Sequence, residues 1–171
     1  AQLRRIAWEI SDAERYRFFM IPKSNGGMRL ISEPKSLLKE KQDKIGTLLV
    51  GSYTPLSRSH GFTKNRGIIT NADLHVRKPW VLNVDLEKFF PSISIDMVEK
   101  VLSKRRFSSK SSAGSKSGKP DEEFRLEPII VSMLANLCCF RSAENSDDPE
   151  TLHGLPQGAP TSPVISDLVA R

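Results

Sequence analysis

Residues 81–93 read VLNVDLEKFFPSI, and the interpretation of the whole chain starts from them. Valine and leucine alternate with polar residues and a proline follows, so the pattern predicts a strand over 80–86 that enters a turn. Asp85 lies near the end of this strand. A buried carboxylate without a partner costs several kcal/mol. Asp85 therefore either binds a cation, a hydrogen-bond network or a metal ion, or is an ordinary strand-end cap.

Length and composition describe a basic globular protein. The 171 residues suffice for one well-buried domain or two small lobes. The net charge of +6 suits a polyanionic partner without identifying one. No apolar run approaches the roughly 18 residues of a membrane span. The first 19 residues lack the apolar centre of a signal peptide, so we expect a cytoplasmic protein without a membrane partner.

The two cysteines, Cys138 and Cys139, are adjacent in an apolar stretch. Neighbouring cysteines seldom bridge each other, and two thiols are too few for a tetrahedral zinc site. We expect both to be buried free thiols in a reducing compartment.

Periodicity and turn residues predict a helix-rich α+β chain without internal repeats. The segment 51–70 is rich in loop-forming residues, and the few strands suggest part of a larger domain. Ser162 followed by Pro163 predicts a helix start with a capping hydroxyl. We expect a hairpin over 16–34 with its turn at 25–27, and helices at 2–11, 36–50, 71–77, 95–105, 128–140 and 162–171.

Residues 100–119 contain seven Lys or Arg, seven Ser and no acidic residue. Such a composition cannot bury enough apolar surface to fold by itself, so we expect a mobile surface loop at about 106–122. The loop is either a nucleic-acid contact or a solvated insertion.

Two further segments have the composition of an anion-binding site. Residues 153–163, HGLPQGAPTSP, hold a rigid backbone directly before a helix N-terminus, which suits a phosphate or a nucleotide edge. Lys23 and Arg29 flank the hairpin turn, where they can form a pair of cations for phosphate oxygens. In isolation, a Pro/Gly connector and solvated hairpin charges explain these residues equally well.

The combination is more specific than its parts. The segments IPKSNGGMRLISEP, HGFTKNRGIITNADLH, VLNVDLEKFFPSI and GLPQGAPTSPVISDL occur in this order. Together they resemble the reverse transcriptases of bacterial retrons and their group II intron-like relatives, from about residue 16 to 171. The resemblance implies the fingers of a right-hand polymerase over residues 1–79 and a partial palm over residues 80–171.

The resemblance assigns a nucleotide site to two of these segments and to the phenylalanine after the strand. Lys23 and Arg29 are expected to hold the triphosphate of the incoming deoxynucleotide. Phe90 is expected to pack under its sugar and disfavour a 2′-hydroxyl. Gln157 and Gly158 are expected to lie along the nascent base pair.

The resemblance also assigns the catalytic carboxylate and a template contact. Asp85, with the main-chain carbonyl of Leu86, is expected to bind the two Mg²⁺ ions of two-metal phosphoryl transfer, which lie about 4 Å apart. Such oxygen ligands suit magnesium. His60, Arg66 and Asn71 are expected to lie near the template and structural RNA.

The family pattern breaks at the other metal-binding carboxylates. These lie in a Tyr-x-Asp-Asp hairpin, which the 171 residues do not contain. The pair Asp147–Asp148 belongs to a polar segment without flanking strands and does not replace it. A thumb is also missing. We therefore expect that these residues alone do not polymerise.

The resemblance predicts an RNA-directed DNA polymerase of retron type in a bacterial cytoplasm. Its expected partners are a structured noncoding RNA template-primer, the RNA–DNA hybrid, deoxynucleoside triphosphates and an effector protein, and its expected role is antiphage defence. The alternatives are a non-catalytic RNA-binding relative, a group II intron or diversity-generating enzyme, and a basic globular domain of another kind.

Overall fold

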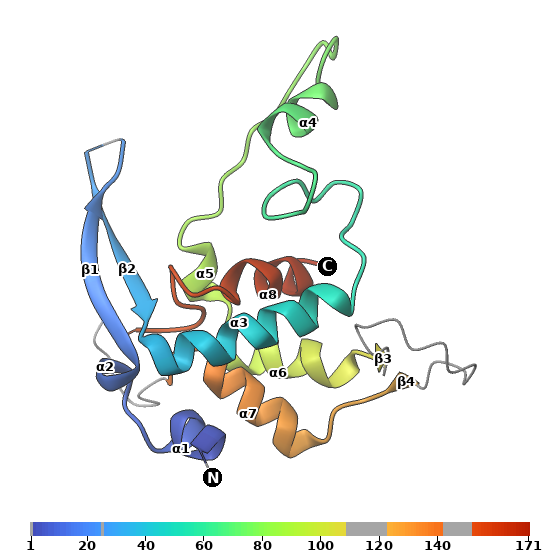
Figure 1. Cartoon of the computed structure of the whole chain (residues 1–171). Coiled ribbons are helices and arrows are strands. Elements are labelled where there is room, and N and C mark those ends of the chain that lie inside the picture. The colour runs from blue at the N-terminus through green and yellow to red at the C-terminus, as the bar shows by residue number, and fades with distance from the viewer. Residues whose placement is uncertain (1, 25, 109–122, 142–151) are drawn as a thin grey trace.

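The computed structural model describes residues 2–24, 26–108, 123–141 and 152–171 (Figure 1). Helices predominate among them, which confirms the predicted helix-rich α+β class. The elements are α1 (Gln2–Trp8), α2 (Asp12–Arg15), β1 (Tyr16–Pro22), β2 (Met28–Pro34), α3 (Ser36–Gly51), α4 (Ile68–Asp73), α5 (Phe89–Ser92), α6 (Ile95–Lys104), β3 (Phe107–Ser108), β4 (Glu123–Phe124), α7 (Pro128–Cys138) and α8 (Ser162–Val169).

The core lies where α3, α6, α7 and α8 pack against one another, with α1 against α7 (Figure 1). Helix α3 buries Leu38, Ile45 and Leu49, which recur at helical spacing on one face, as the sequence predicts. Leu37 and Leu48 lie beside that face and are exposed.

The predicted hairpin is confirmed. β1 and β2 are antiparallel, and their register pairs Tyr16 with Pro34 and Ile21 with Arg29. Because side chains alternate between the two faces of a strand, Tyr16, Ser32 and Pro34 lie on one face, and all three are buried. This face joins the hairpin to the core.

The N-terminal segment is held to α7 by a buried arginine. The helix predicted over 2–11 ends at Trp8, because Ser11 caps a new helix with a reciprocal bond to Glu14. Arg15 is 2% exposed and ion-pairs with Asp12. Its guanidinium also donates to the carbonyl oxygens of Asn136 at 2.6 Å and Cys139 at 3.1 Å.

The prediction that both thiols are buried and free is confirmed, and the reducing compartment stays a prediction. Helix α7 begins at Pro128 as expected and ends at Cys138, two residues before the predicted end. Phe140 then packs edge-on against Tyr16, with ring centroids 5.1 Å apart.

The prediction of a strand over 80–86 is wrong. These residues form neither a strand nor a helix, and all their side chains are exposed. A strand needs a neighbour to accept its backbone hydrogen bonds, and within the described residues the paired strands are β1 with β2 and β3 with β4. The helix predicted over 71–77 is α4, which begins earlier at Ile68 and ends at Asp73.

The predicted cap of the last helix is also wrong in detail. Thr161, not Ser162, precedes the first turn of α8. The hydroxyl of Ser162 donates 2.7 Å to the carbonyl oxygen of Pro156 instead of capping. Pro163 lies in the first turn as expected.

Most of the Ser/Lys-rich loop lies outside the described residues, as does the pair Asp147–Asp148. The described part corrects the predicted start of the loop at about residue 106. Phe107 and Ser108 pair with Phe124 and Glu123, and Phe107 is buried. The boundary between residues 1–79 and 80–171 stays a prediction.

Candidate functional site

Lys23 and Arg29 lie at the free end of the hairpin and are exposed. Ile21 pairs with Arg29, and the backbone N–H of Lys23 donates 2.7 Å to the carbonyl oxygen of Gly27. The register therefore puts Lys23, Arg29 and Ile31 on the face opposite Tyr16. The two cations share one side of the hairpin, as a phosphate site requires.

The segment 153–161 runs between the hairpin and the turn that follows Asp85. At one end, the N–H of Leu155 donates 3.1 Å to the carbonyl oxygen of Phe90. At the other end, the N–H of Ser32 in β2 donates 2.8 Å to the carbonyl oxygen of Gln157. We call residues 153–161 the bridging turn, because backbone hydrogen bonds tie it to both neighbours.

Only part of the bridging turn reaches solvent. Gly158 is exposed and Gln157 half-buried, whereas Leu155, Ala159 and Thr161 are buried. The N-terminus of α8, which was expected to suit a phosphate or a nucleotide edge, is not accessible to one, since Thr161 and Ser162 are 0% exposed. Next to the hairpin, the surface of the turn that a ligand can reach is the Gln157–Gly158 peptide; His153 is exposed at the other end.

Gly158 lies against the hairpin face that carries the cations. A Cβ at this position would lie 2.9 Å from Cγ2 of Ile31. Ile31 is two residues from Arg29 on the same strand and therefore on the same face. The structure thus places Gly158 against Ile31, on the hairpin face that also carries Lys23 and Arg29, although more than 120 residues separate it from them in the sequence.

Asp85 and Leu86 lie in an extended segment and are exposed. Within the described part of the chain, the Asp85 carboxylate has no hydrogen-bond or ion-pair partner. Lys88 then takes a left-handed conformation, with φ of 49°, directly before α5. A non-glycine residue in this region is uncommon and often marks a functional turn.

Phe90 is half-buried in α5, and its ring lies 6.1 Å from that of Phe89. Its carbonyl oxygen accepts from the N–H groups of Ile93 and Leu155, both at 3.1 Å. The bridging turn therefore contacts the backbone of Phe90 directly.

The segment 56–71 is organised by its own side chains. Arg66 donates to the carbonyl oxygens of Leu56 and, at 2.8 Å, of Ser59. His60 Nδ1 lies 2.9 Å from the Thr70 hydroxyl. Asn71 is exposed on α4. Arg66 and His60 thus hold the shape of this loop. None of these hydrogen bonds reaches the bridging turn.

With this geometry in place, comparison with known proteins identifies the family. A profile of the family described as reverse transcriptase (RNA-dependent DNA polymerase) matches residues 21–171. The chain belongs to the reverse transcriptase family. The predicted family is thereby confirmed, and the matched range includes the hairpin, the Asp85 segment and the bridging turn.

Individual relatives of this reverse transcriptase chain come from retrons. It is 28% identical to the retron Ec86 reverse transcriptase of Escherichia coli over 157 residues, 91% of this chain and 40% of the relative. It is 32% identical to the retron Mx65 reverse transcriptase of Myxococcus xanthus, over 90% of this chain and 33% of the relative. The chain therefore spans about a third to two fifths of the length of these relatives.

Reasoning from the sequence missed two residues that shape the candidate site, Ser32 and Gly154. Ser32 is buried and supplies the N–H that binds Gln157. Gly154 has a φ of 62° and packs on the carbonyl oxygens of α5. Gly154 stands in the HGLPQG motif, so its glycine identity was a visible signal, but its contact surface was not.

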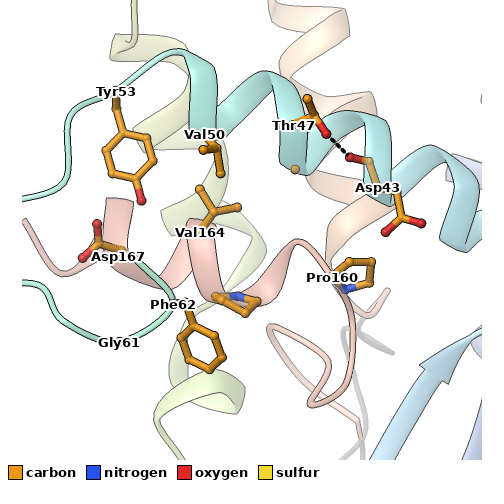
Figure 2. Close-up of a pocket in the computed structure, with 11 residues that line it drawn as sticks. Asp43, Thr47, Val50, Tyr53, Gly61, Phe62, Pro160, Val164 and Asp167 are labelled. Atoms are coloured by element: carbon orange, nitrogen blue, oxygen red, sulfur yellow. Dashed lines mark hydrogen bonds between the residues drawn. The ribbon is translucent and has the colours of Figure 1, made fainter. Parts of the chain in front are cut away.

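A separate cavity of about 290 Å³ lies between α3, the loop at 61–62 and α8 (Figure 2). Phe62, Val50 and Val164 line it together with the carboxylates of Asp43 and Asp167. Burial and the neighbouring Asp167 raise the pKa of Tyr53 at its edge. Two carboxylates in the lining repel phosphate, so this cavity does not suit a triphosphate.

No group of three or more His, Cys, Asp or Glu residues that could hold a metal ion occurs in the described ranges. The free carboxylate of Asp85 and the neighbouring carbonyl of Leu86 are oxygen donors of the kind that magnesium prefers. Asp85 and Leu86 can therefore supply two ligands of a magnesium site, which needs further ligands to be complete.

Proposed function

We propose that the chain forms the fingers, residues 1–79, and the first part of the palm, residues 80–171, of a retron-type RNA-directed DNA polymerase. The observation that supports this most directly is the bridging turn, which joins the basic hairpin to the turn after Asp85. The family profile and the retron relatives agree with it. The alternatives are a non-catalytic RNA-binding relative and a group II intron or diversity-generating enzyme, and the experiments below test the first of them.

In this proposal, the exposed hairpin face and the bridging turn form the deoxynucleotide site. Lys23 and Arg29 bind the triphosphate oxygens, for which a lysine and an arginine are suited donors. Gln157 and Gly158 lie along the nascent base pair. Phe90 packs under the sugar and excludes a 2′-hydroxyl.

The Asp85 carboxylate and the Leu86 carbonyl would hold magnesium. The metal supplies charge stabilisation for the in-line attack of a primer 3′-hydroxyl on the α-phosphate. Asp85 is suited to this role because it is exposed and unpaired among the described residues, so no existing bond has to break. A complete site needs more carboxylates, which the resemblance places in a Tyr-x-Asp-Asp hairpin.

The proposed partner is a structured noncoding RNA that serves as template and primer, and the product is an RNA–DNA hybrid. The net charge of +6 favours such a polyanion. His60, Arg66 and Asn71 are proposed to lie near the template. We also propose that the polymerase acts in antiphage defence, works with an effector protein and is located in a bacterial cytoplasm. Among the helices of the described residues, none has the length and apolarity to cross a bilayer.

The test of the proposal is Asp85→Asn in the full-length gene product. We expect primer extension on RNA to fall by about 100-fold or more, because a metal ion contributes several kcal/mol to the transition state. RNA affinity, measured by filter binding, should stay nearly unchanged. Asp96→Asn is the matched control, since Asp96 is an exposed aspartate in the first turn of α6.

Two outcomes count against the proposal. Extension retained in Asp85→Asn removes Asp85 from the metal site. RNA binding without any extension by the wild-type gene product favours the non-catalytic relative. Residues 1–171 alone should bind RNA in a salt-dependent manner and not extend a primer; extension by them contradicts the expectation that further carboxylates are required.

A further inference from the structure

Gly154 packs against α5 without room for a side chain. A Cβ built on Gly154 would lie 2.6 Å from the carbonyl oxygen of Ile93 and 2.9 Å from that of Phe90, and closer still to that of Pro91. Real Cβ atoms essentially never approach so closely, and the three neighbours are backbone atoms that cannot rotate away. Its φ of 62° also disfavours any residue with a side chain.

The hydrogen bonds around Gly154 link it to two elements. Its carbonyl oxygen accepts from the N–H of Phe140, at 2.9 Å, directly after α7. The next residue, Leu155, is 0% exposed and donates to the carbonyl oxygen of Phe90. Gly154 is therefore fixed from the core side, and α5 rests on it.

Gly158 occupies the other end of the bridging turn and has a different neighbour. Its φ is 119°, and a Cβ there would lie 2.9 Å from Cγ2 of Ile31 and 3.3 Å from the carbonyl oxygen of Ser32. A substitution at Gly158 displaces the hairpin, whereas one at Gly154 displaces α5. The two ends of one turn thus position two different parts of the proposed nucleotide site.

We infer that Gly154 is a specificity-determining positioning residue, which sets the height of the Phe90 ring through α5 and thereby the selection of deoxy- over ribonucleotides. The inference rests on the proposed function, because it needs Phe90 to face the sugar. Gly154 acts through Phe90 and does not contact the nucleotide. Gly158 positions the hairpin cations and so affects triphosphate binding, which deoxy- and ribonucleotides share.

The experiment compares glycine-to-alanine variants of the full-length gene product. Single-nucleotide extension is measured with a deoxynucleotide and with the matching ribonucleotide, and the ratio of their kcat/KM values is the readout. We expect Gly154→Ala to lower this ratio about tenfold or more, which is the scale of a methylene-sized change in a pocket. Gly158→Ala should raise KM for both nucleotides and leave the ratio unchanged.

Gly51→Ala is the control, because a Cβ there meets nothing within 4 Å and its φ is not left-handed. We expect wild-type kinetics from it. Pro91→Ala serves as a second, milder variant should Gly154→Ala fail to fold. Pro91 is exposed in α5, and its ring fixes its own φ and restricts the backbone of the preceding Phe90. Its loss loosens the backbone that carries Phe90 and contacts Gly154, so the ratio should fall in the same direction.

The outcomes separate the inference from the function on which it rests. Wild-type discrimination in a folded Gly154→Ala, or in Pro91→Ala if the glycine variant does not fold, overturns the inference and leaves the polymerase proposal intact. A ratio that falls equally in Gly158→Ala also overturns it, because the two ends of the turn then act alike. Absence of extension by the wild-type gene product overturns the proposed function and the inference together.

Discussion

Residues 54–88 and the core formed by α3, α6, α7 and α8 both carry long apolar side chains. The core buries them, whereas residues 54–88 expose them. Leu49 and Val98 in the core are 0% exposed, whereas Trp80 and Ile68 are 90% exposed. Figure 1 shows most of the segment 54–88 projecting away from the helices, with α4 near its far end, while its loop at 61–62 lies against α3 and α8. We call residues 54–88 the arm.

The backbone differs in the same way as the burial. All four non-glycine residues with positive φ in the described part of the chain lie in the arm: Phe62, Asn65, Arg77 and Lys88. Left-handed backbone costs free energy and persists where the surroundings hold it. Apolar residues become a folded element only where a neighbour covers them and accepts their backbone hydrogen bonds, and the arm has few such neighbours.

The largest expected effect is the loss of the buried cation at the base of the core. Arg15→Ala leaves the Asp12 carboxylate unpaired and two carbonyl oxygens at the end of α7 without their donor. Breaking one partner of a buried pair costs about 3–5 kcal/mol. Urea unfolding followed by circular dichroism measures this loss of the free energy of unfolding.

Arg58→Ala is the matched change in the arm, because Arg58 is exposed and forms no ion pair among the described residues. It should change the free energy of unfolding by no more than about 0.5 kcal/mol. Equal effects of the two substitutions would contradict the division into core and arm.

The second comparison removes one leucine from each region. Leu49→Ala opens a cavity beneath α3 and should cost about 2–5 kcal/mol. Leu82→Ala removes a side chain that is 86% exposed and should cost no more than about 0.5 kcal/mol. The same urea titration measures both. A large cost for Leu82→Ala would mean that the arm packs against something in solution.

The same contrast explains which elements could be predicted from the sequence. Helix α3 was predictable because Leu38 and Ile45 recur at helical spacing. The hairpin was predictable because an Asn-Gly-Gly turn separates two apolar runs. The strand over 80–86 was not, because the alternation of Leu82, Val84 and Leu86 with polar residues describes a strand only when another strand lies beside it. The local sequence pattern therefore predicts an element best where the residues that pair with it are close in sequence or where the element packs in the core.

The candidate site was predictable in its residues more than in its contacts. Motif resemblance selected Gln157 and Gly158, but the bond from Ser32 to Gln157 joins residues 125 positions apart, and periodicity carries no signal for it. The same holds for Gly154, which packs against the carbonyl oxygens of Phe90 and Pro91 in α5 and of Ile93 directly after it. Such close approaches depend on tertiary packing.

A third prediction uses the buried thiols of the core. Burial raises the pKa of Cys138 from 9.0 to about 12, and burial raises the pKa of Cys139 as well. Unfolded thiols ionise near pH 9 and the folded ones do not, so the contribution of the thiols to the free energy of unfolding is constant well below pH 9 and falls above it. Each thiol should contribute a loss of about 1.4 kcal/mol per pH unit.

Urea unfolding at pH 7, 9 and 10 measures this slope. Because burial also raises the pKa of Tyr16 above its ordinary value of 10.0, Tyr16 adds to the loss near pH 10, and the share of one thiol is the difference between the unsubstituted chain and Cys138→Ala. Cys138→Ala should reduce the slope by the share of one thiol. Because Cys138 is 0% exposed, the substitution also leaves a small cavity and lowers the free energy of unfolding at pH 7 by about 1 kcal/mol. An unchanged free energy of unfolding between pH 9 and 10 in the unsubstituted chain would mean that the thiols are not shielded from solvent.

The smallest expected effect is confined to the arm and separates the shape of Arg66 from its charge. Arg66→Lys keeps the cation but loses the planar fork that donates to the carbonyl oxygens of Leu56 and Ser59. We expect faster amide hydrogen exchange within residues 56–66, a change in global stability of at most about 1 kcal/mol, and nearly unchanged RNA affinity.

Arg66→Ala should add a loss of RNA affinity and reduce the salt dependence by about one phosphate contact, if the cation meets the template as proposed. Lys64→Ala, a neighbouring exposed cation, controls for charge alone. Since the arm has little burial to hold it, unchanged exchange in Arg66→Lys would show that the loop is fixed by contacts other than this guanidinium, and the arm would then resemble the core more than its exposure indicates.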